Sequence, residues 1–162
     1  MLAVLALACR PERAALPGAG AAQPAPPSDT AAMDTASDSL ALELVLPRQI
    51  RRGESVPITL QVQNRSRRTL DLYLRGRTPT VDVVVARQSG EVVWRRLEKE
   101  IIPAILHLRP LAPGECLDIG TVWDQRTSQG VKVEAGEYLA RGVLLVEGDQ
   151  LETSWVPLHL VE

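Results

Sequence analysis

The chain has 162 residues, of which 45% are hydrophobic and 23% are charged, a composition typical of one globular domain with or without a tail. Its formal net charge of −2 excludes nucleic-acid binding through bulk positive charge. Aromatic residues make up only 3% and Phe is absent, so we expect a core built mainly from Val, Leu and Ile.

The first nine residues are typical of the end of a bacterial export signal. Residues 2–8 are all Leu, Ala or Val, and this stretch is much shorter than the roughly 20 residues of a membrane-spanning helix. Residues 6–9 resemble a lipobox, in which a signal peptidase cuts before the cysteine and the cysteine then carries lipid. We therefore expect residues 1–9 to be a signal-peptide remnant and Cys9 to be lipidated, with a membrane as partner through that anchor. The alternative is an apolar start that ends in an ordinary cysteine.

Residues 10–39 predict a disordered linker. They are mostly Ala, Pro, Ser, Asp, Thr and Gly, so burial cannot offset the entropy lost on ordering. Five prolines also break any helix: Pro11, Pro17, Pro24, Pro26 and Pro27. A lipidated cysteine, a linker and a domain at residues 40–162 together predict a protein of the cell envelope, in the periplasm or at the outer membrane. The alternative is a cytoplasmic protein with a disordered N-terminus.

From residue 40 onward, short apolar runs alternate with Gly, Pro, Asn and Ser, which predicts strands joined by turns. The clearest run is residues 55–63, where every second residue is apolar and Pro57 marks the start or an edge of a strand. A loop is expected from residue 97 to residue 105. Further strands are expected at residues 69–74, 80–86, 91–95, just before Pro110, and at 116–124, 131–133, 138–147 and 153–161.

A hairpin turn is expected at residues 87–90, where Gly90 suits a positive φ. On the returning strand, Val92 and Trp94 are expected to share one face. About eight short strands at intervals near ten residues, with no amphipathic helix, favour an all-β fold: an immunoglobulin-like antiparallel β-sandwich of about 7–9 strands. A small barrel is the alternative.

No arrangement of residues indicates catalysis. His107 and His159 each lie in an expected strand, and neither has a second His or Cys at metal-ligand spacing. The sequence contains no Gly-rich phosphate loop and no Gly-x-Ser-x-Gly motif. Cys116, at the start of a strand, is expected to be a small buried residue. We therefore expect a protein that is not an enzyme and that holds no cofactor or metal.

Arginines are concentrated between residues 48 and 77, where acidic residues are few. If these arginines gather at one end of the sandwich, they form a surface for an acidic partner or for anionic lipid headgroups. The alternative is a set of separate, solvated side chains. The basic residues are Arg48, Arg51, Arg52, Arg65, Arg67, Arg68, Arg75 and Arg77, and the acidic ones are Glu54 and Asp71.

Several short motifs follow one another in a distinctive order. An alternating strand is followed by an Asn-x-Ser turn, and the returning strand of the hairpin begins with Gly-Glu-Val-Val-Trp-Arg. A Leu-Ala-Pro-Gly-Glu turn then precedes a strand that ends in Val-Trp-Asp-Gln. Gly-x-Tyr opens the next strand. The residues that carry this order are Asn64, Gly90, Trp94, Pro113, Gly114, Trp123, Gly136 and Tyr138. From about residue 53 to residue 147, the succession resembles the BsuPI family, the bacterial intracellular proteinase inhibitors. This resemblance implies an immunoglobulin-like sandwich that inhibits a subtilisin-like serine protease, and the matching residues are structural.

An inhibitor of this kind would block its protease with an exposed loop that the sandwich holds rigid, because pre-organisation limits the entropy cost of binding. Three connections are candidates: residues 75–79, 97–105 and 126–129. Within the first and third, the candidate contact residues are Arg75, Arg77, Pro79, Arg126 and Ser128. The alternative is a non-inhibitory envelope module that binds a partner protein through a sheet edge or a loop face. A carbohydrate-binding sandwich, with Trp155 as its exposed aromatic residue, is a third possibility.

Overall fold

The computed structural model describes residues 39–76, 80–148 and 150–162. The expected signal remnant with Cys9, the linker apart from Ser39, and the candidate residues Arg77 and Pro79 lie outside the described residues. Ser39 is buried, and its carbonyl oxygen accepts a hydrogen bond of 2.8 Å from the Arg65 amide. The folded part therefore includes the last residue of the predicted linker.

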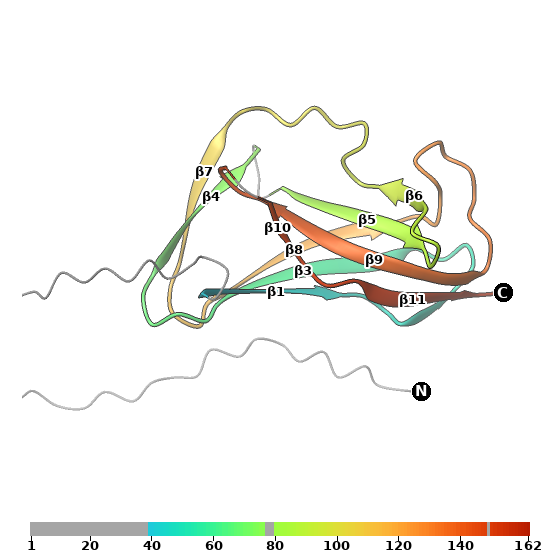
Figure 1. Ribbon diagram of the computed structural model, residues 1–162, viewed down its shortest axis with the longest axis horizontal. Helices are drawn as coiled ribbons and strands as arrows, with labels where there is room; N and C mark the ends of the chain where they lie inside the picture. Colours follow the sequence, from blue (N-terminus) through green and yellow to red (C-terminus); the bar gives the residue numbers. More distant parts are fainter. Residues whose placement is uncertain (1–38, 77–79, 149) are drawn as a thin grey trace, which may run out of the picture.

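The described residues form eleven strands in three sheets (Figure 1). The strands are β1 (Leu40–Val45), β2 (Gln49–Arg51), β3 (Val56–Asn64), β4 (Leu70–Arg75), β5 (Val81–Arg87), β6 (Val92–Arg95), β7 (Leu106–Leu111), β8 (Cys116–Trp123), β9 (Gly136–Leu145), β10 (Gln150–Glu152) and β11 (Val156–Val161). One sheet has the order β1-β3-β8, a larger one has the order β2-β11-β9-β5-β6 with β10 beside β9, and β4 with β7 forms a two-stranded ribbon. The pairs are antiparallel except β2 with β11. The expected all-β sandwich is confirmed.

Eleven strands exceed the seven to nine expected. The three additions are β1, β2 and β10, of which the last two have only three residues each, too few to show an alternating pattern. In the opposite direction, residues 131–133 form no strand, and an isolated bridge joins Lys132 to Arg126. β3 keeps the predicted alternation, with every second residue buried. Pro57 is its second residue, beyond the last β1 pair at Thr59, so the predicted position at a strand start is confirmed.

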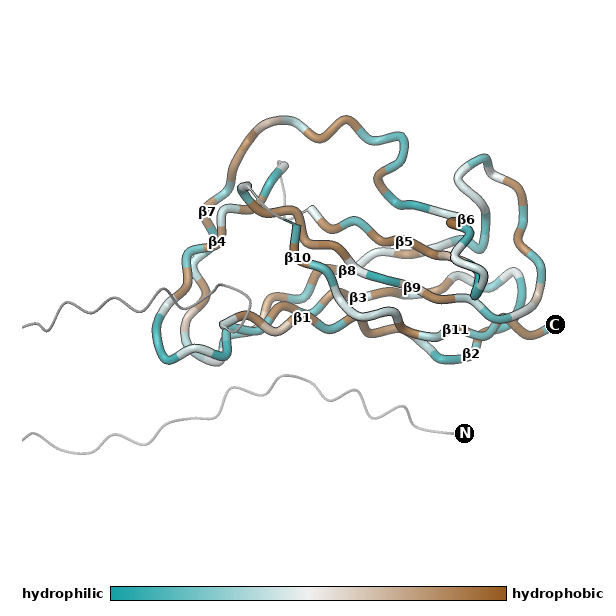
Figure 2. The backbone as a smooth tube through the Cα atoms, viewed as in Figure 1, coloured by the Kyte–Doolittle hydropathy of each residue, from teal (hydrophilic) through white to brown (hydrophobic). Residues whose placement is uncertain are grey.

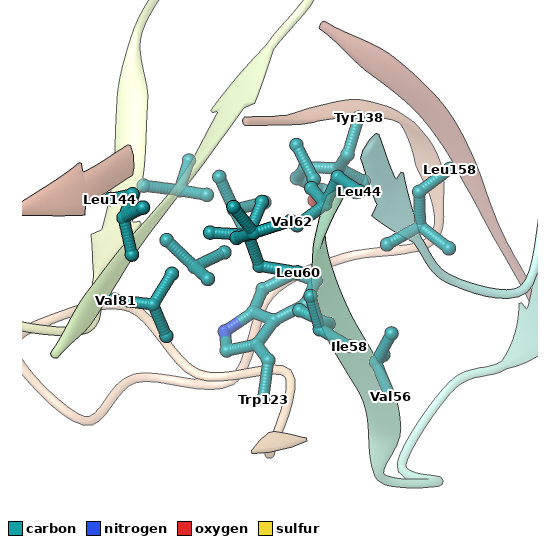
Figure 3. Packing of buried hydrophobic residues seen from close by; sticks show 14 of the residues in the cluster. Leu44, Val56, Ile58, Leu60, Val62, Val81, Trp123, Tyr138, Leu144 and Leu158 are labelled. Carbon is teal, nitrogen blue, oxygen red and sulfur yellow. The ribbon is translucent and has the colours of Figure 1, made fainter. Parts of the chain in front are cut away.

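Aliphatic side chains from the two larger sheets fill the core, as the composition predicted (Figure 3). In Figure 3, Leu60 and Val62 of β3 lie beside Trp123 of β8. The Trp123 ring centroid is 6.0 Å from that of Tyr138 and 6.1 Å from that of Trp94. Trp94 is half-buried and packs on the edge of the core, while Trp123 and Tyr138 lie inside it.

The two sheets approach each other closely at Gly142 of β9. A Cβ atom at this position would lie 2.9 Å from Leu44 Cδ1 and 3.0 Å from Leu60 Cδ1, closer than carbon atoms normally pack. A side chain here would force neighbouring leucines out of their positions. Glycine at residue 142 therefore sets the spacing between the sheets at this point.

The expectation that Val92 and Trp94 share a face is wrong. The β5–β6 pairing contains a bulge, so Val92 lies opposite Ala86 while Trp94 lies opposite Val85. Val85 and Ala86 are successive residues of β5 and therefore point to opposite faces, so Trp94 and Val92, which lie opposite them, do as well. Accordingly, Val92 is 54% exposed while Trp94 packs against the core.

β8 is an edge strand, and its side chains alternate between exposed and half-buried until Trp123, which is fully buried. This alternation agrees with the predicted strand. Cys116, at the first position, is half-buried, whereas the sequence predicted a buried residue. The prediction of a fully buried cysteine is therefore wrong.

A corner at Asn64 turns the β3–β8 pair into the β4–β7 ribbon, which stands at one end of the sandwich (Figure 1). The Asn64 side chain is fully buried and its polar atoms are satisfied. Its Nδ2 donates to the carbonyl oxygens of Arg68 (2.8 Å) and Leu111 (2.9 Å), and its Oδ1 accepts from the Ser66 amide (2.9 Å). The corner requires a side chain that bonds both the segment after β3 and the end of β7, because buried backbone groups without a hydrogen-bond partner are costly.

Candidate functional site

The candidate loop at residues 97–105 joins β6 to β7 and crosses the outer face of the larger sheet (Figure 1). At its start, Leu97 packs against Val143 and Leu145 of β9, and Ile102 packs against the same cluster. Just before the loop, Arg96 Nη1 donates to the Val81 carbonyl oxygen at 2.6 Å. The loop is therefore attached to the sheet on both sides of residues 98–101, and it also buries the outer face of β5.

A buried carboxylate in the middle of β5 holds the start of this loop. The Asp82 side chain is 1% exposed, and its Oδ1 accepts a hydrogen bond of 3.0 Å from the Leu97 amide. Its Oδ2 forms an ion pair with Arg95 Nε at the end of β6. Hydrogen bonds to an ionised group are stronger than neutral ones, especially where water is excluded. Asp82 was not singled out from the sequence, although a charged residue inside a run of valines was a usable signal.

The loop displays one apolar side chain. Ile101 is 96% exposed, the highest value among the exposed large hydrophobic residues of the described chain. On one side of it, the Glu100 amide donates to the Leu97 carbonyl oxygen at 3.1 Å, which closes a turn. On the other side lies Ile102, which is partly buried. Ile101 therefore stands between two fixed points, an arrangement that the loop assignment from sequence did not resolve to a residue.

Gln125 fixes the entrance of the second candidate loop, residues 126–129. It is buried and has a φ of 57°, a conformation that is uncommon for residues other than glycine. Its Nε2 donates to the carbonyl oxygens of Arg51 (2.8 Å) and Glu54 (2.7 Å), and its Oε1 accepts from the Gly53 amide (2.8 Å). This side chain thereby ties the loop to the β2–β3 turn; the sequence placed Gln125 at the end of the Val-Trp-Asp-Gln motif but did not indicate this role.

The candidate residues Arg126 and Ser128 make contacts within the domain. Ser128 Oγ accepts from the Arg95 amide at 3.1 Å, and the Ser128 amide donates to the Val93 carbonyl oxygen at 3.1 Å, so this residue pins the loop to β6. The Arg126 carbonyl oxygen accepts from Trp123 Nε1 at 2.8 Å, and its Nη1 donates to the Gly130 carbonyl oxygen at 2.8 Å. Both residues therefore shape the loop.

The structure brings residues 126–129 beside the start of residues 97–105. A shallow cavity of about 270 Å³ lies between them and is lined by residues of both, among them Trp94, Glu98, Lys99, Thr127, Gln129 and Gly130. The lining carries charges of both signs.

Of the third candidate loop, residues 75–79, the described residues Arg75 and Gly76 lie at the other end of residues 97–105. The Gly76 amide donates to the Ile105 carbonyl oxygen at 2.9 Å. A second shallow cavity, of about 320 Å³, is lined there by Arg75, Ile102, Pro103 and Glu147 among others. Residues 97–105 therefore link the other two candidates, which lie at opposite ends of the loop.

The arginines of residues 48–75 do not form one patch. Arg51 lies in β2, whose backbone is bonded to Gln125 beyond one end of β8. Arg65 and Arg67 lie in the corner after Asn64, which pairs with the opposite end of β8 through Glu115. The eight residues of β8 separate the two groups, so a single basic surface made of all of them is excluded for the described residues.

The residues that carried the family resemblance occupy turns and the core. Gly90 and Gly114 have φ values of 89° and 75° in their turns, which favours glycine. Tyr138 donates its hydroxyl to the Glu134 carbonyl oxygen at 2.8 Å. Burial raises the pKa of the Tyr138 hydroxyl above 10.0, and the charge of Arg87 opposes part of this rise. The remaining members are Asn64, Trp94, Pro113, Trp123 and Gly136.

The described residues contain neither a metal-binding cluster nor a membrane-spanning helix. Among residues 39–76, 80–148 and 150–162, no group of three or more His, Cys, Asp or Glu side chains is arranged to hold a metal ion. The same part of the chain contains no helix with the length and hydrophobicity needed to cross a membrane.

Several solved structures contain a part that is similar in fold. A chain of dimeric latent PorU from Porphyromonas gingivalis has a TM-score of 0.46 and 22% identity over 75% of this chain and 9% of its own length. The alkylpurine DNA glycosylase AlkC of Pseudomonas fluorescens has a TM-score of 0.42 and 16% identity over 76% of this chain and 31% of its own. A β-glucosidase from Listeria innocua has a TM-score of 0.44 and 14% identity over 76% and 16%. This chain spans less than a third of each, and similarity at this level gives no basis for transferring function.

Sequence comparison is more specific. No curated protein matches the chain. The family model described as "BsuPI: Intracellular proteinase inhibitor" matches residues 45–148, which include β3 to β9 and all three candidate loops. The predicted resemblance is confirmed over most of the folded domain: the chain belongs to the BsuPI family of intracellular proteinase inhibitors.

Proposed function

We propose that this domain inhibits a subtilisin-like serine protease by placing residues 97–105 in the active-site cleft, with Ile101 as the leading side chain. Family membership supports inhibition of a proteinase as the general activity, and inhibitors of this family are not themselves catalysts. The observation that carries the choice of loop is the exposed Ile101 between the anchored Leu97 and Ile102. A fixed loop loses little conformational entropy on binding, so more of its contact energy appears as affinity.

The apolar tip also bears on the kind of protease. An exposed isoleucine gains free energy when a partner covers it, at roughly 25 cal/mol per Å² of apolar surface. A protease with an apolar substrate cleft can provide that cover, whereas a cleft selective for Arg or Lys cannot. Residues 126–129 lie beside the start of the loop and would contact the rim of the cleft.

The experiment is a titration of a subtilisin-type protease with the full chain and with two variants. Wild-type protein should remove protease activity at a near-stoichiometric ratio and remain uncut. Ile101→Asp should raise the inhibition constant at least tenfold, because it places a charge in the apolar contact. Val122→Asp is the matched control, since Val122 is also exposed (58%) but lies on β8 of the other sheet.

Each outcome of this titration tests a different part of the proposal. Loss of inhibition in both variants would point to a general defect, which thermal unfolding of each variant would reveal. Unchanged inhibition by Ile101→Asp would assign the contact to residues 75–79 or 126–129. No inhibition by wild-type protein at large molar excess would refute the proposal for subtilisin-type enzymes.

We also propose that a lipid on Cys9 anchors the protein in the cell envelope. The support is the sequence of residues 2–9 followed by a linker-like segment. This location differs from the word intracellular in the family description, so the protease met by this chain would be one of the envelope. Labelling of cells with a radioactive fatty acid should mark the wild-type protein and not Cys9→Ser, and equal absence of label in both would refute the anchor.

A further inference from the structure

β7 is the outer strand of the ribbon at the end of the sandwich (Figure 1). It pairs with β4 from Leu106 opposite Arg75 to Leu111 opposite Leu70, and with no other described strand. The far side of β4 is occupied, because Leu74 bridges Val146 and the Tyr73 carbonyl oxygen accepts from the Glu147 amide at 2.9 Å. The β7 side of the ribbon offers outward-facing backbone groups at Leu106 and Leu108 to an additional strand.

The exposed face of this ribbon has an apolar centre, with Arg75 at one end and Asp71 at the other. Leu106 is 42% exposed and Leu108 is 54% exposed, and Tyr73, which lies directly opposite Leu108, is also exposed. Leu106 and Leu108 alternate along β7 and share one face with Tyr73. Figure 2 shows hydrophobic and hydrophilic colour along β7, which lies on the outside of the molecule. Exposed side chains such as Tyr73 and Leu108 can pack against the apolar residues of an extended segment that lies alongside β7.

Two other edges of the fold are interrupted along their length. β6 pairs with β5 through a bulge, which twists the edge away from an incoming strand. β8 carries Asp118 and Gly120 at exposed positions. On β7, residues 106–108 include no Lys, acidic residue, Gly or bulge, and the protective residues Arg109 and Pro110 lie toward the end of the strand.

The size and charge of the surface indicate its occupant. A six-residue strand is about 20 Å long, whereas a stable protein dimer needs roughly 20–30 residues from each partner. Addition of a single extended segment, in which backbone hydrogen bonds supply affinity, needs only a short edge. Arg75 flanks one end of β7, and Arg65 and Arg67 lie in the corner that joins the other end. These three arginines are exposed and form no ion pair with a described residue, while Asp71, Glu147 and Glu115, which is paired with Arg109 of β7, are nearby acids.

We propose that β7 binds an extended segment of a partner protein that has alternating apolar residues and acidic residues at its ends. The segment adds to the β4–β7 ribbon as a third strand, covers Leu106 and Leu108 together with Tyr73, and places carboxylates near Arg75 and Arg67. A second copy of this chain is disfavoured, because it would bring the same arginines together. This interaction goes beyond protease inhibition and does not depend on it.

The test uses the full chain labelled with ¹⁵N and a synthetic octapeptide, Asp-Val-Thr-Val-Thr-Val-Thr-Asp. Titration should shift the backbone amides of residues 106–109 and newly protect those of Leu106 and Leu108, which point away from β4, with the other edges unaffected. Leu108→Lys should weaken binding at least tenfold, and the matched control Val122→Lys should not. A peptide with Lys in place of both Asp residues should bind more weakly, by a factor that falls as salt is added.

Two results would overturn the proposal. One is the absence of shifts at residues 106–109 up to millimolar peptide, or shifts of equal size at β8. The other is protection of the Leu106 and Leu108 amides without peptide, together with a concentration-dependent dimer in sedimentation, which would make a second copy the occupant. Leu106→Lys repeats the test at a second exposed position, so a folding defect in one variant leaves the other to decide.

Discussion

Replacement of Asp82 tests whether the sandwich holds the candidate loop in place. In Asp82→Ala, the Leu97 amide loses its acceptor while it remains buried, and Arg95 loses its partner. In Asp82→Asn, a side-chain oxygen can still accept from Leu97, and only the charge is lost. Arg95→Ala removes the other half of the ion pair and leaves the bond to Leu97 intact.

The magnitudes follow from the burial of each group. A buried donor left without an acceptor costs about 1–3 kcal/mol, and a hydrogen bond to a charged group contributes about 1.5–3 kcal/mol. The Arg95 side chain is half exposed and can return to water in Asp82→Ala, whereas Arg95→Ala leaves the buried Asp82 carboxylate without a counter-charge. We therefore expect Asp82→Ala and Arg95→Ala to lower the free energy of unfolding by about 2–4 kcal/mol each, and Asp82→Asn by about 1 kcal/mol.

Three measurements check this reasoning: urea unfolding, amide hydrogen exchange at Leu97, and inhibition of the protease. Asp82→Ala should unfold at lower urea, exchange the Leu97 amide faster, and inhibit at least tenfold more weakly, since a loosened loop must be ordered on binding. Unchanged stability together with unchanged exchange at Leu97 would refute the role of Asp82 as an anchor. Lower stability with unchanged inhibition under folded conditions would instead show that binding does not depend on this end of the loop.

Two further predictions concern the core. Gly142→Ala should lower the free energy of unfolding by about 1–3 kcal/mol, because its methyl group overlaps leucines of the opposite sheet, whereas Gly120→Ala, which has open space around it, should change it by less than about 0.5 kcal/mol in the same urea titration. Because burial raises the pKa of Tyr138 in the folded state, the folded chain holds this proton more tightly, so the stabilisation is complete below about pH 10 and is lost as the pH rises further. Between about pH 8 and about pH 11, the wild-type protein should therefore lose more stability than the Tyr138→Phe variant. The control variant Tyr73→Phe, which changes an exposed tyrosine, should lose as much stability as the wild type. Equal losses in the wild type and both variants would contradict this prediction.

The sequence contained enough information for the fold class, because strand periodicity is a local property. The alternation in β3 and the turn glycines Gly90 and Gly114 can be read from neighbouring residues alone. The order of these short motifs also identified the family, which the match to residues 45–148 supports independently.

Pairing between strands could not be read in this way. A bulge opposite Val85 put Val92 and Trp94 on opposite faces, and it depends on how β6 meets β5. The strands β2 and β10 exist only because a neighbouring strand supplies their hydrogen bonds. How far each side chain of β8 is buried likewise depends on what packs against it: Trp123 is fully buried, and Cys116 on the same strand is half-buried.

For the candidate site, the sequence by itself determined that an inhibitor-like sandwich would have three polar or irregular connections, one of them at residues 97–105. Only the tertiary structure decided that Asp82 anchors this connection, that Ile101 is its exposed residue, and that Ser128 and Arg126 serve their own loop. The physical reason is that periodicity reports which side of an element is apolar, while anchoring and exposure depend on contacts between residues distant in the chain. Asp82 and Leu97 are 15 residues apart, and their bond forms only after β5, β6 and the loop have packed together.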